Sequence, residues 1–157
     1  MLGCNIGAKN LNSIMAIKVI EYGSEEYKEM VALRMEILRK PLGLTFNEED
    51  LEKEQKDLLI GAYEEEKLLA CCILTPLSKT NIKLRQMAVS HKMQRLGVGT
   101  AMLDFAEHLA RDAHYTAMVI NARTTAIGFY EKMGYSIHGD EFTEVGLPHV
   151  EMRKKLL

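Results

Sequence analysis

The sequence predicts a single α/β domain built on a mixed β-sheet, and three observations predict it. Short segments that alternate apolar and polar side chains, as half-buried strands do, recur along the chain. Between them lie segments whose apolar residues repeat at helical spacing. The 157 residues are enough for one domain with a sizeable core, and no linker-like or repetitive tract divides them. Residues 1–14 lack periodicity and are predicted to be a peripheral extension, so the domain is expected to span 15–157.

The elements are predicted in the order β-α-α-β-β-β-α-β-α-β-β, which is typical of an α/β domain. Ser24 is expected to cap the first helix, and Pro41 and Gly43 to end it. Asn47 begins a short acidic helix, and the apolar stripe from Val98 to Leu109 marks the clearest helix. Strands are predicted at 17–22, 58–63, 68–74, 82–89, 115–120, 135–138 and 149–154, and the last two helices at 98–112 and 125–133.

Composition excludes several classes of function. The net charge is −2, so the whole protein has no electrostatic attraction to nucleic acid. The three cysteines, Cys4, Cys71 and Cys72, provide neither a disulfide framework nor metal-ligand spacing, and a cytoplasmic protein without a metal is expected. Since no apolar stretch approaches the ~20 residues of a membrane span, no membrane partner is expected.

The segment between the strand at 82–89 and the helix at 98–112 carries the strongest chemical signal. Gly97 precedes the helix and Gly99 lies in its first turn, where unpaired backbone N–H groups and the helix dipole suit phosphate oxygens. Without side chains, these glycines would allow a diphosphate to approach the backbone. A tight strand-to-helix turn explains the same glycines without any ligand. The P-loop motif is absent, and Met102 stands where a dinucleotide motif has its third glycine, so other phosphate ligands are favoured.

Two separate blocks resemble one family. Gln94-Arg95-Leu96-Gly97-Val98-Gly99 resembles the Q/R-x-x-G-x-G/A coenzyme A loop of the GNAT acetyltransferases, and the strand before it resembles that family's central strand. Downstream, residues 126–135 resemble the family pattern A-x-x-F-Y-x-K-x-G-[FY]. The resemblance implies a mixed, mostly antiparallel sheet of about six or seven strands with flanking helices. It also implies that the central parallel strands splay apart to receive coenzyme A.

The resemblance implies a coenzyme site as well. It assigns contacts with coenzyme A to Met87, Ala88, Val89, Gln94, Arg95, Leu96, Gly97, Val98, Gly99, Thr100, Asn121 and Tyr130. The chain departs from the family at one place, because Arg123 stands where many members carry an asparagine that contacts the coenzyme. Asn121 substitutes for that contact, or the contact is lost or changed.

Acetyl transfer needs a neutral amine and a proton for the departing thiolate. Tyr130 matches the family tyrosine placed near the coenzyme sulfur, although it would also suit a core position on its helix. Glu36, His149 and Glu151 are the candidates for the general base, and a histidine can accept a proton near neutral pH.

The first helix borders the acceptor pocket in this family, so Arg34 and Arg39 are candidates for binding a substrate carboxylate or phosphate. A solvated helix face is the alternative explanation for both. The stretch 33–43 also resembles a little-characterised bacterial GNAT subgroup.

The resemblance therefore predicts an acetyl-CoA-dependent N-acetyltransferase that acts on a primary amine of a small molecule or peptide. A coenzyme A-binding sensor or regulatory module with weak catalysis is the alternative. A nucleic-acid-binding helix around 92–111 is disfavoured because its face is mixed with Asp104 and Glu107. A homodimer is possible, since relatives often form one.

Overall fold

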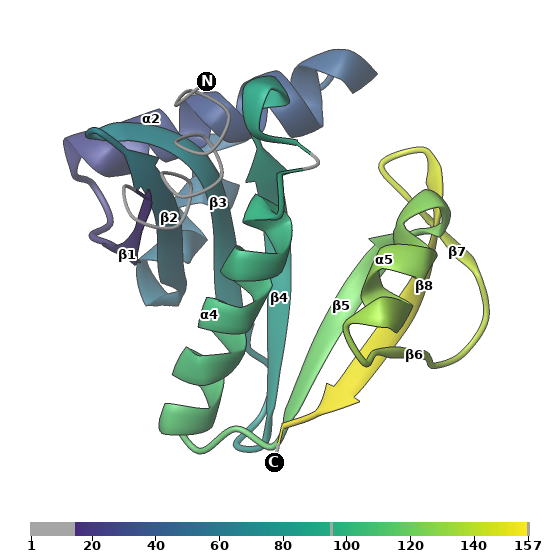
Figure 1. Ribbon diagram of the computed structural model, residues 1–157. Coiled ribbons are helices and arrows are strands. Elements are labelled where there is room, and N and C mark those ends of the chain that lie inside the picture. Colours follow the sequence, from purple (N-terminus) through teal and green to yellow (C-terminus); the bar gives the residue numbers. More distant parts are fainter. Residues whose placement is uncertain (1–14, 95, 157) are drawn as a thin grey trace, which may run out of the picture.

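The computed structural model describes residues 15–94 and 96–156, which form one twisted sheet with helices on both faces (Figure 1). The strands are β1 (Met15–Ile20), β2 (Leu58–Glu64), β3 (Lys67–Pro76), β4 (Asn81–Val89), β5 (Ala117–Arg123), β6 (Ser136–Ile137), β7 (Phe142–Glu144) and β8 (Leu147–Lys155). The α-helices are α2 (Glu25–Arg34), α3 (Glu48–Glu52), α4 (Val98–Asp112) and α5 (Ile127–Lys132). Shorter helical turns are η1 (Met35–Arg39), η2 (Lys40–Leu42), η3 (Lys53–Lys56), η4 (His91–Met93) and η5 (Thr124–Ala126).

The strands follow the spatial order β1-β2-β3-β4-β5-β8-β6, and β7 pairs with β8 beside this path. Every pair is antiparallel except β4 with β5, which run parallel in the middle of the sheet. The prediction of a mixed, mostly antiparallel sheet with central parallel strands is confirmed. The described part of the chain has eight strands, and the sequence pattern did not predict the three-residue β7.

Two hydrophobic clusters cover the two faces of the sheet. On one face, α4 packs Met102 and Ala106 against Ile82 and Leu84 of β4. On the other face, α2 packs Met30 and its neighbours against β2 and β3. The predicted bounds of α4 agree with the structure. Because α4 and α2 lie on opposite faces, the side chains of β4 point alternately toward one helix and the other.

The first helix begins as the sequence predicts and then departs from the prediction. The Ser24 hydroxyl accepts a hydrogen bond from the Tyr27 N–H at 3.1 Å, which caps α2. Met30 and Leu33 are buried beside Tyr27, and α2 ends at Arg34, before the predicted stop at Pro41 and Gly43. The chain then widens into the π-helical turn η1, which shifts the face that the following residues present.

No helix in the described ranges 15–94 and 96–156 is long and apolar enough to cross a membrane. Within the same ranges, no group of three or more His, Cys, Asp or Glu side chains lies close enough together to hold a metal ion. The predicted extension, residues 1–14, lies outside the described residues.

Candidate active site

The two central strands separate halfway along their length. β4 and β5 pair in parallel from Asn81 with Ala117 to Leu84 with Ile120, and the pairing stops there. Beyond this point β4 continues beside β3 while β5 continues beside β8 (Figure 1). The register of β3 with β4 shifts at the same place, and Gln86 adopts a left-handed backbone conformation with φ of 55°. This bulge bends β4 away from β5.

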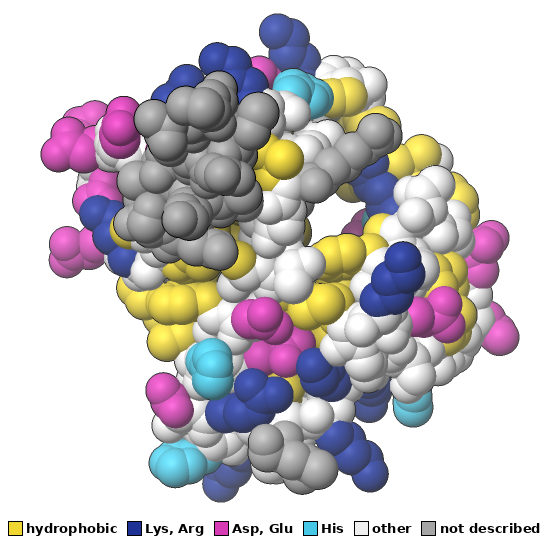
Figure 2. Space-filling model, in the orientation of Figure 1, with side chains coloured by type: hydrophobic (Ala, Val, Ile, Leu, Met, Phe, Trp, Pro, Cys, Tyr) yellow, Lys and Arg dark blue, Asp and Glu magenta, His cyan; other side chains and the backbone are white. Residues whose placement is uncertain are grey.

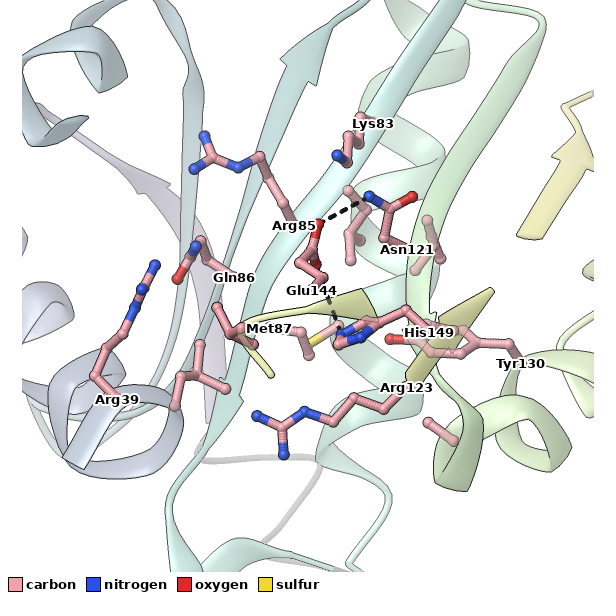
Figure 3. Close-up of a pocket in the computed structure, with 16 residues that line it drawn as sticks. Arg39, Lys83, Arg85, Gln86, Met87, Asn121, Arg123, Tyr130, Glu144 and His149 are labelled. Atoms are coloured by element: carbon pink, nitrogen blue, oxygen red, sulfur yellow. Dashed lines mark hydrogen bonds and ion pairs between the residues drawn. The ribbon is translucent and has the colours of Figure 1, made fainter. Parts of the chain in front are cut away.

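A pocket of about 700 Å³ lies at the separation. Figure 2 shows a hollow here between the two halves of the molecule, bordered by hydrophobic and basic side chains. Its walls come from the end of the first helix, β4, β5, α5 and the β7–β8 hairpin (Figure 3). The lining residues are Leu38, Arg39, Lys83, Leu84, Arg85, Gln86, Met87, Ile120, Asn121, Ala122, Arg123, Ala126, Tyr130, Glu144, Val145 and His149.

Tyr130 projects from α5 into the wall of this pocket (Figure 3). Its ring packs edge-on against Phe129 and Tyr135, and only 8% of the residue is exposed. Burial raises the pKa of the Tyr130 phenol to about 12, because the phenolate would lose its hydration. The phenol is therefore neutral, and able to donate a hydrogen bond, at physiological pH.

His149 and Glu144 form a polar group on the opposite side of the pocket mouth from β4 (Figure 3). The buried His149 ring lies with Nδ1 2.9 Å from the Leu147 carbonyl and Nε2 3.6 Å from a Glu144 carboxylate oxygen. The other Glu144 oxygen accepts a hydrogen bond from the Asn121 amide at 3.2 Å. Since a carbonyl oxygen can only accept, the neutral ring carries its proton on Nδ1 and leaves a lone pair on Nε2.

The glycine-rich segment forms the connection that the sequence predicts between β4 and α4. Gly97 is the N-cap of α4 with φ of 82°, a left-handed conformation that glycine adopts without strain. Among the described residues, a Cβ on Gly99 would meet the Phe129 ring alone, at 3.7 Å. The side-chain amide of Gln94 donates a hydrogen bond from Nε2 to the Val89 carbonyl at 3.0 Å and closes the turn. Arg95, also predicted to contact the coenzyme, lies outside the described residues.

The structure brings some of the predicted site residues together and separates others. Met87, Asn121, Tyr130, His149 and Arg39 line one pocket. The predicted coenzyme residues of the turn and the helix start lie beyond the carboxyl end of β4, outside the lining of this pocket; they are Gln94, Leu96, Gly97, Val98, Gly99 and Thr100.

Three charged candidates have other surroundings than the sequence suggested. Arg34 is fully buried, and its two terminal nitrogens donate to Glu54 at 2.8 and 2.7 Å, so the guanidinium binds inside the protein and not at the pocket. Glu36 is exposed on η1 and does not line the pocket. Glu151 accepts a hydrogen bond from Arg153 at 2.7 Å and does not line the pocket. Of the three predicted base candidates, His149 is the one that lines it.

Two of the remaining coenzyme predictions fall at the end of β4. Ala88 is buried in the cluster beneath α2, so only its backbone could reach a ligand. Val89 packs at the edge of the α4 cluster and does not line the pocket.

Sequence reasoning missed several pocket residues. Lys83 and Arg85 alternate with the buried Ile82 and Leu84, and this alternation was a signal that they point away from α4. Glu144 had no such signal, because it belongs to the short β7 and reaches the pocket only through the β7–β8 hairpin.

The chain matches known proteins over most of its length. The acetyltransferase (GNAT) domain family matches residues 40–156. An uncharacterised N-acetyltransferase of Bacillus subtilis, YjcF, is 29% identical over 137 residues, covering 87% of this chain and 97% of that protein. A candidate N-acetyltransferase from Lactobacillus plantarum has a crystal structure that superposes with a TM-score of 0.80 at 25% identity, covering 90% of this chain and 99% of the other.

A GNAT acetyltransferase from Elizabethkingia anophelis, crystallised with acetyl-CoA bound, has the same fold with a TM-score of 0.70. It is 18% identical and covers 91% of this chain and 99% of its own. The two sequence blocks, the separated central strands and the match to the family domain thus agree. The chain belongs to the GNAT family of acetyltransferases.

Proposed function

We propose that the protein transfers an acetyl group from acetyl-CoA to a primary amine of a small molecule or peptide. The observation that carries this proposal is the separation of β4 from β5, with Tyr130 and His149 facing the pocket that it opens. In the proposal acetyl-CoA supplies the acetyl group, and the protein supplies a binding gap, a proton acceptor and a proton donor.

The gap suits the long, thin pantetheine arm of the coenzyme. Beyond Leu84 and Ile120, the facing edges of β4 and β5 no longer pair with each other. Backbone N–H and C=O groups on such edges need other partners, and an amide-containing chain can provide them. Met87 lies on this part of β4 and lines the pocket. The open surface at Gly97 and Gly99 lies at the end of the same gap, where a diphosphate would reach the start of α4.

His149 is the proposed proton acceptor for the incoming amine. An ammonium group cannot attack a thioester, so the acceptor must lose a proton first. With Nδ1–H directed at the Leu147 carbonyl, the lone pair of Nε2 faces the side on which Glu144 lies. After Nε2 accepts the proton, the imidazolium can pair with the Glu144 carboxylate oxygen that lies 3.6 Å away.

Tyr130 is the proposed donor to the sulfur as negative charge develops on it. Its phenol keeps its proton because burial raises the pKa to about 12. It stands on α5, across the gap from Met87 (Figure 3). A donor already fixed by packing has little reorganisation to undergo when charge develops.

A thiol-release assay with acetyl-CoA and a panel of primary amines tests the proposed function. We expect turnover with at least one class of amine, together with acetyl-CoA binding in calorimetry. Gly99→Leu should weaken acetyl-CoA binding more than about tenfold, since a side chain would occupy the diphosphate surface. Folding should be preserved, because the contact that a Cβ would make here with the Phe129 ring, at 3.7 Å, is an ordinary van der Waals distance.

Asp104→Leu is the matched control, because it puts the same side chain on an exposed position of the same helix. Coenzyme affinity that is equal in Gly99→Leu and wild type would contradict the assignment of the turn. Tight binding without turnover of any amine would contradict the proposed activity and favour a coenzyme A sensor.

A further inference from the structure

Opposite charges occupy opposite walls of the pocket. Glu144 lies with His149 on the wall formed by the β7–β8 hairpin, while Arg39, Lys83 and Arg85 lie on the wall formed by η1 and β4 (Figure 3). We call the wall formed by η1 and β4 the basic wall. Arg123 extends from β5 beneath Met87 toward it (Figure 3). Among the described residues that line the pocket, four are Lys or Arg and one is Glu. A ligand that carries only positive charge would therefore meet net repulsion here.

Three of the four basic side chains that line the pocket form no ion pair with a carboxylate of the described residues. Arg85 pairs with the largely buried Asp57 at 3.4 Å, which offsets its charge. Arg123, Lys83 and Arg39 form no ion pair with any residue in the described ranges of the chain. Of these three, Lys83 and Arg39 belong to the wall opposite His149. Both are only partly exposed, so an anion that reached them would be attracted more strongly than at an open surface.

The guanidinium of Arg39 is held in place before any ligand arrives. It stacks on the Phe46 ring at 4.7 Å, and the buried guanidinium of Arg34 lies at the same distance from that ring. Arg34 in turn makes two hydrogen bonds with Glu54. Stacking leaves the N–H donors at the edge of the Arg39 guanidinium free to bind a planar anion, and a group that is already ordered binds at lower entropic cost.

The phosphates of the coenzyme do not explain these charges. Lys83 lies in the closed part of the sheet, opposite Val119, and the glycine turn follows the far end of β4. The seven residues from Lys83 to Val89 span about 20 Å of strand. Arg39 belongs to η1, which packs on the sheet face opposite α4. With the coenzyme bound as proposed, its diphosphate would lie at the turn, one strand length from Lys83 and on the other face of the sheet from η1, which carries Arg39.

The basic wall also contains a buried polar atom that lacks a partner. The side-chain oxygen of Gln86 is shielded from water and makes no hydrogen bond with the described residues. Gln86 lines the pocket at the bulge of β4, between Arg85 and Met87. Buried polar groups normally find a partner, so this wall is suited to a polar ligand.

We infer that the acetyl acceptor is a small amine that also carries an anionic group. Arg39 and Lys83 bind the anion, and the amino group lies across the pocket at His149 and Glu144. This inference rests on the proposed function and specifies the substrate class of the same site. It excludes polyamines and other wholly cationic acceptors as preferred substrates.

Matched pairs of amines test the inference in the thiol-release assay. 4-Aminobutyrate is compared with butylamine, and phosphoethanolamine with ethanolamine, so that each pair differs in its anion. Spermidine serves as the cationic amine. For wild type we expect kcat/KM at least about tenfold higher for one anionic member than for its neutral partner, the gain expected of a charge-assisted hydrogen bond. The pair that shows the gain tells a carboxylate from a phosphate.

Variants of the basic wall link the preference to its residues. Arg39→Gln and Lys83→Met should each reduce the anionic-to-neutral ratio about tenfold while leaving the KM for acetyl-CoA unchanged. Arg39→Lys should restore part of the ratio. Arg153→Gln is the control, since Arg153 pairs with Glu151 and does not line the pocket.

Equal use of anionic and neutral amines, a preference for spermidine, or a ratio unchanged in both variants would each overturn the inference. If no amine turns over, the proposed function fails separately. The same compounds are then titrated into the acetyl-CoA complex by calorimetry, and the inference stands only if anionic members bind more tightly and lose that advantage in Arg39→Gln.

Discussion

At the scale of single residues, the proposed chemistry is divided between two buried side chains that face one pocket. The sequence predicted Tyr130 from its family pattern and named His149 as one of three base candidates. The structure adds Glu144 beside the ring and the Leu147 carbonyl that determines which ring nitrogen is free. Neither partner could be predicted, because both depend on how the β7–β8 hairpin folds back.

The two residues should affect different features of the kinetics. Tyr130→Phe removes only the hydroxyl, so kcat should fall about 100-fold, with little change in the KM for acetyl-CoA and in the pH profile. His149→Gln removes the proton acceptor, so the remaining rate should rise with pH only as the amine deprotonates in solution. Steady-state kinetics between pH 6 and about 9.5 measure both.

Tyr63→Phe is the control for the first variant, because Tyr63 is a buried tyrosine in the other hydrophobic cluster. A Tyr130→Phe enzyme with wild-type kcat would exclude the phenol as proton donor. An unchanged pH profile in His149→Gln would exclude the imidazole as the base.

At the scale of elements, a buried ion pair fixes the first helix to the segment that follows it. Glu54 on η3 accepts two hydrogen bonds from Arg34 and one from the Tyr27 hydroxyl, at 2.7 Å. These residues are buried together. Arg34 is the last residue of α2, so the pair also positions the start of η1, the turn that carries Arg39 into the pocket wall. The pair was not predictable, because the partners lie 20 residues apart and no periodic pattern links them.

Glu54→Gln should destabilise the fold strongly. Removing one charge leaves the Arg34 guanidinium buried without its counterion, which costs about 3–5 kcal/mol. For a domain of this size, the melting temperature should fall by about 10 °C or more. Thermal unfolding followed by circular dichroism measures the loss.

Glu25→Gln provides the matched control, since its pair with Lys28 is exposed and should contribute little. The double variant Arg34→Met with Glu54→Leu should recover part of the stability, because no unpaired charge remains. Glu54→Gln melting at the wild-type temperature would contradict the importance assigned to the pair.

The elements also differ in how far sequence alone determined them. The period of α4 and the Ser24 cap are local, and both were predicted with their residues. The end of the first helix was predicted less well, because η1 changes the helical repeat after Arg34. The three-residue β7 has no pattern of its own and is defined by its pairing with β8. Local sequence signals therefore predicted the main helices and strands. The pocket walls that depend on contacts between distant segments, such as the β7–β8 hairpin, were not predicted.

At the scale of the whole molecule, four buried tyrosines link stability to alkaline pH. Burial is the main cause that raises the pKa of Tyr27, Tyr63 and Tyr135, and it raises that of Tyr130 to about 12. In the unfolded chain a tyrosine loses its proton near pH 10. Between these values the folded state holds more protons than the unfolded state, so raising the pH favours unfolding.

The contribution of these four tyrosines to the free energy of unfolding should thus be constant below about pH 9.5 and fall above pH 10. Tyr130 alone should contribute a loss on the order of 1 kcal/mol per pH unit between pH 10 and about 12. Urea unfolding at several pH values measures the change, and tyrosinate absorbance reports when the phenols ionise. Stability that stays level to about pH 11, or ionisation of all six phenols near pH 10 in the folded protein, would contradict this expectation.

The brief parallel contact between β4 and β5 has a mechanical consequence. Four residue pairs, with the hydrogen bonds that the Thr116 and Ala117 N–H groups donate to the Thr80 carbonyl, join the backbone of the β1–β4 half to that of the half built from β5 and β8, and all lie at one end of the strands. A pantetheine chain lying between the free ends would act like an inserted strand, bonded to both sides. Binding of the cosubstrate would then join the two halves and make the molecule more rigid across the separation between β4 and β5.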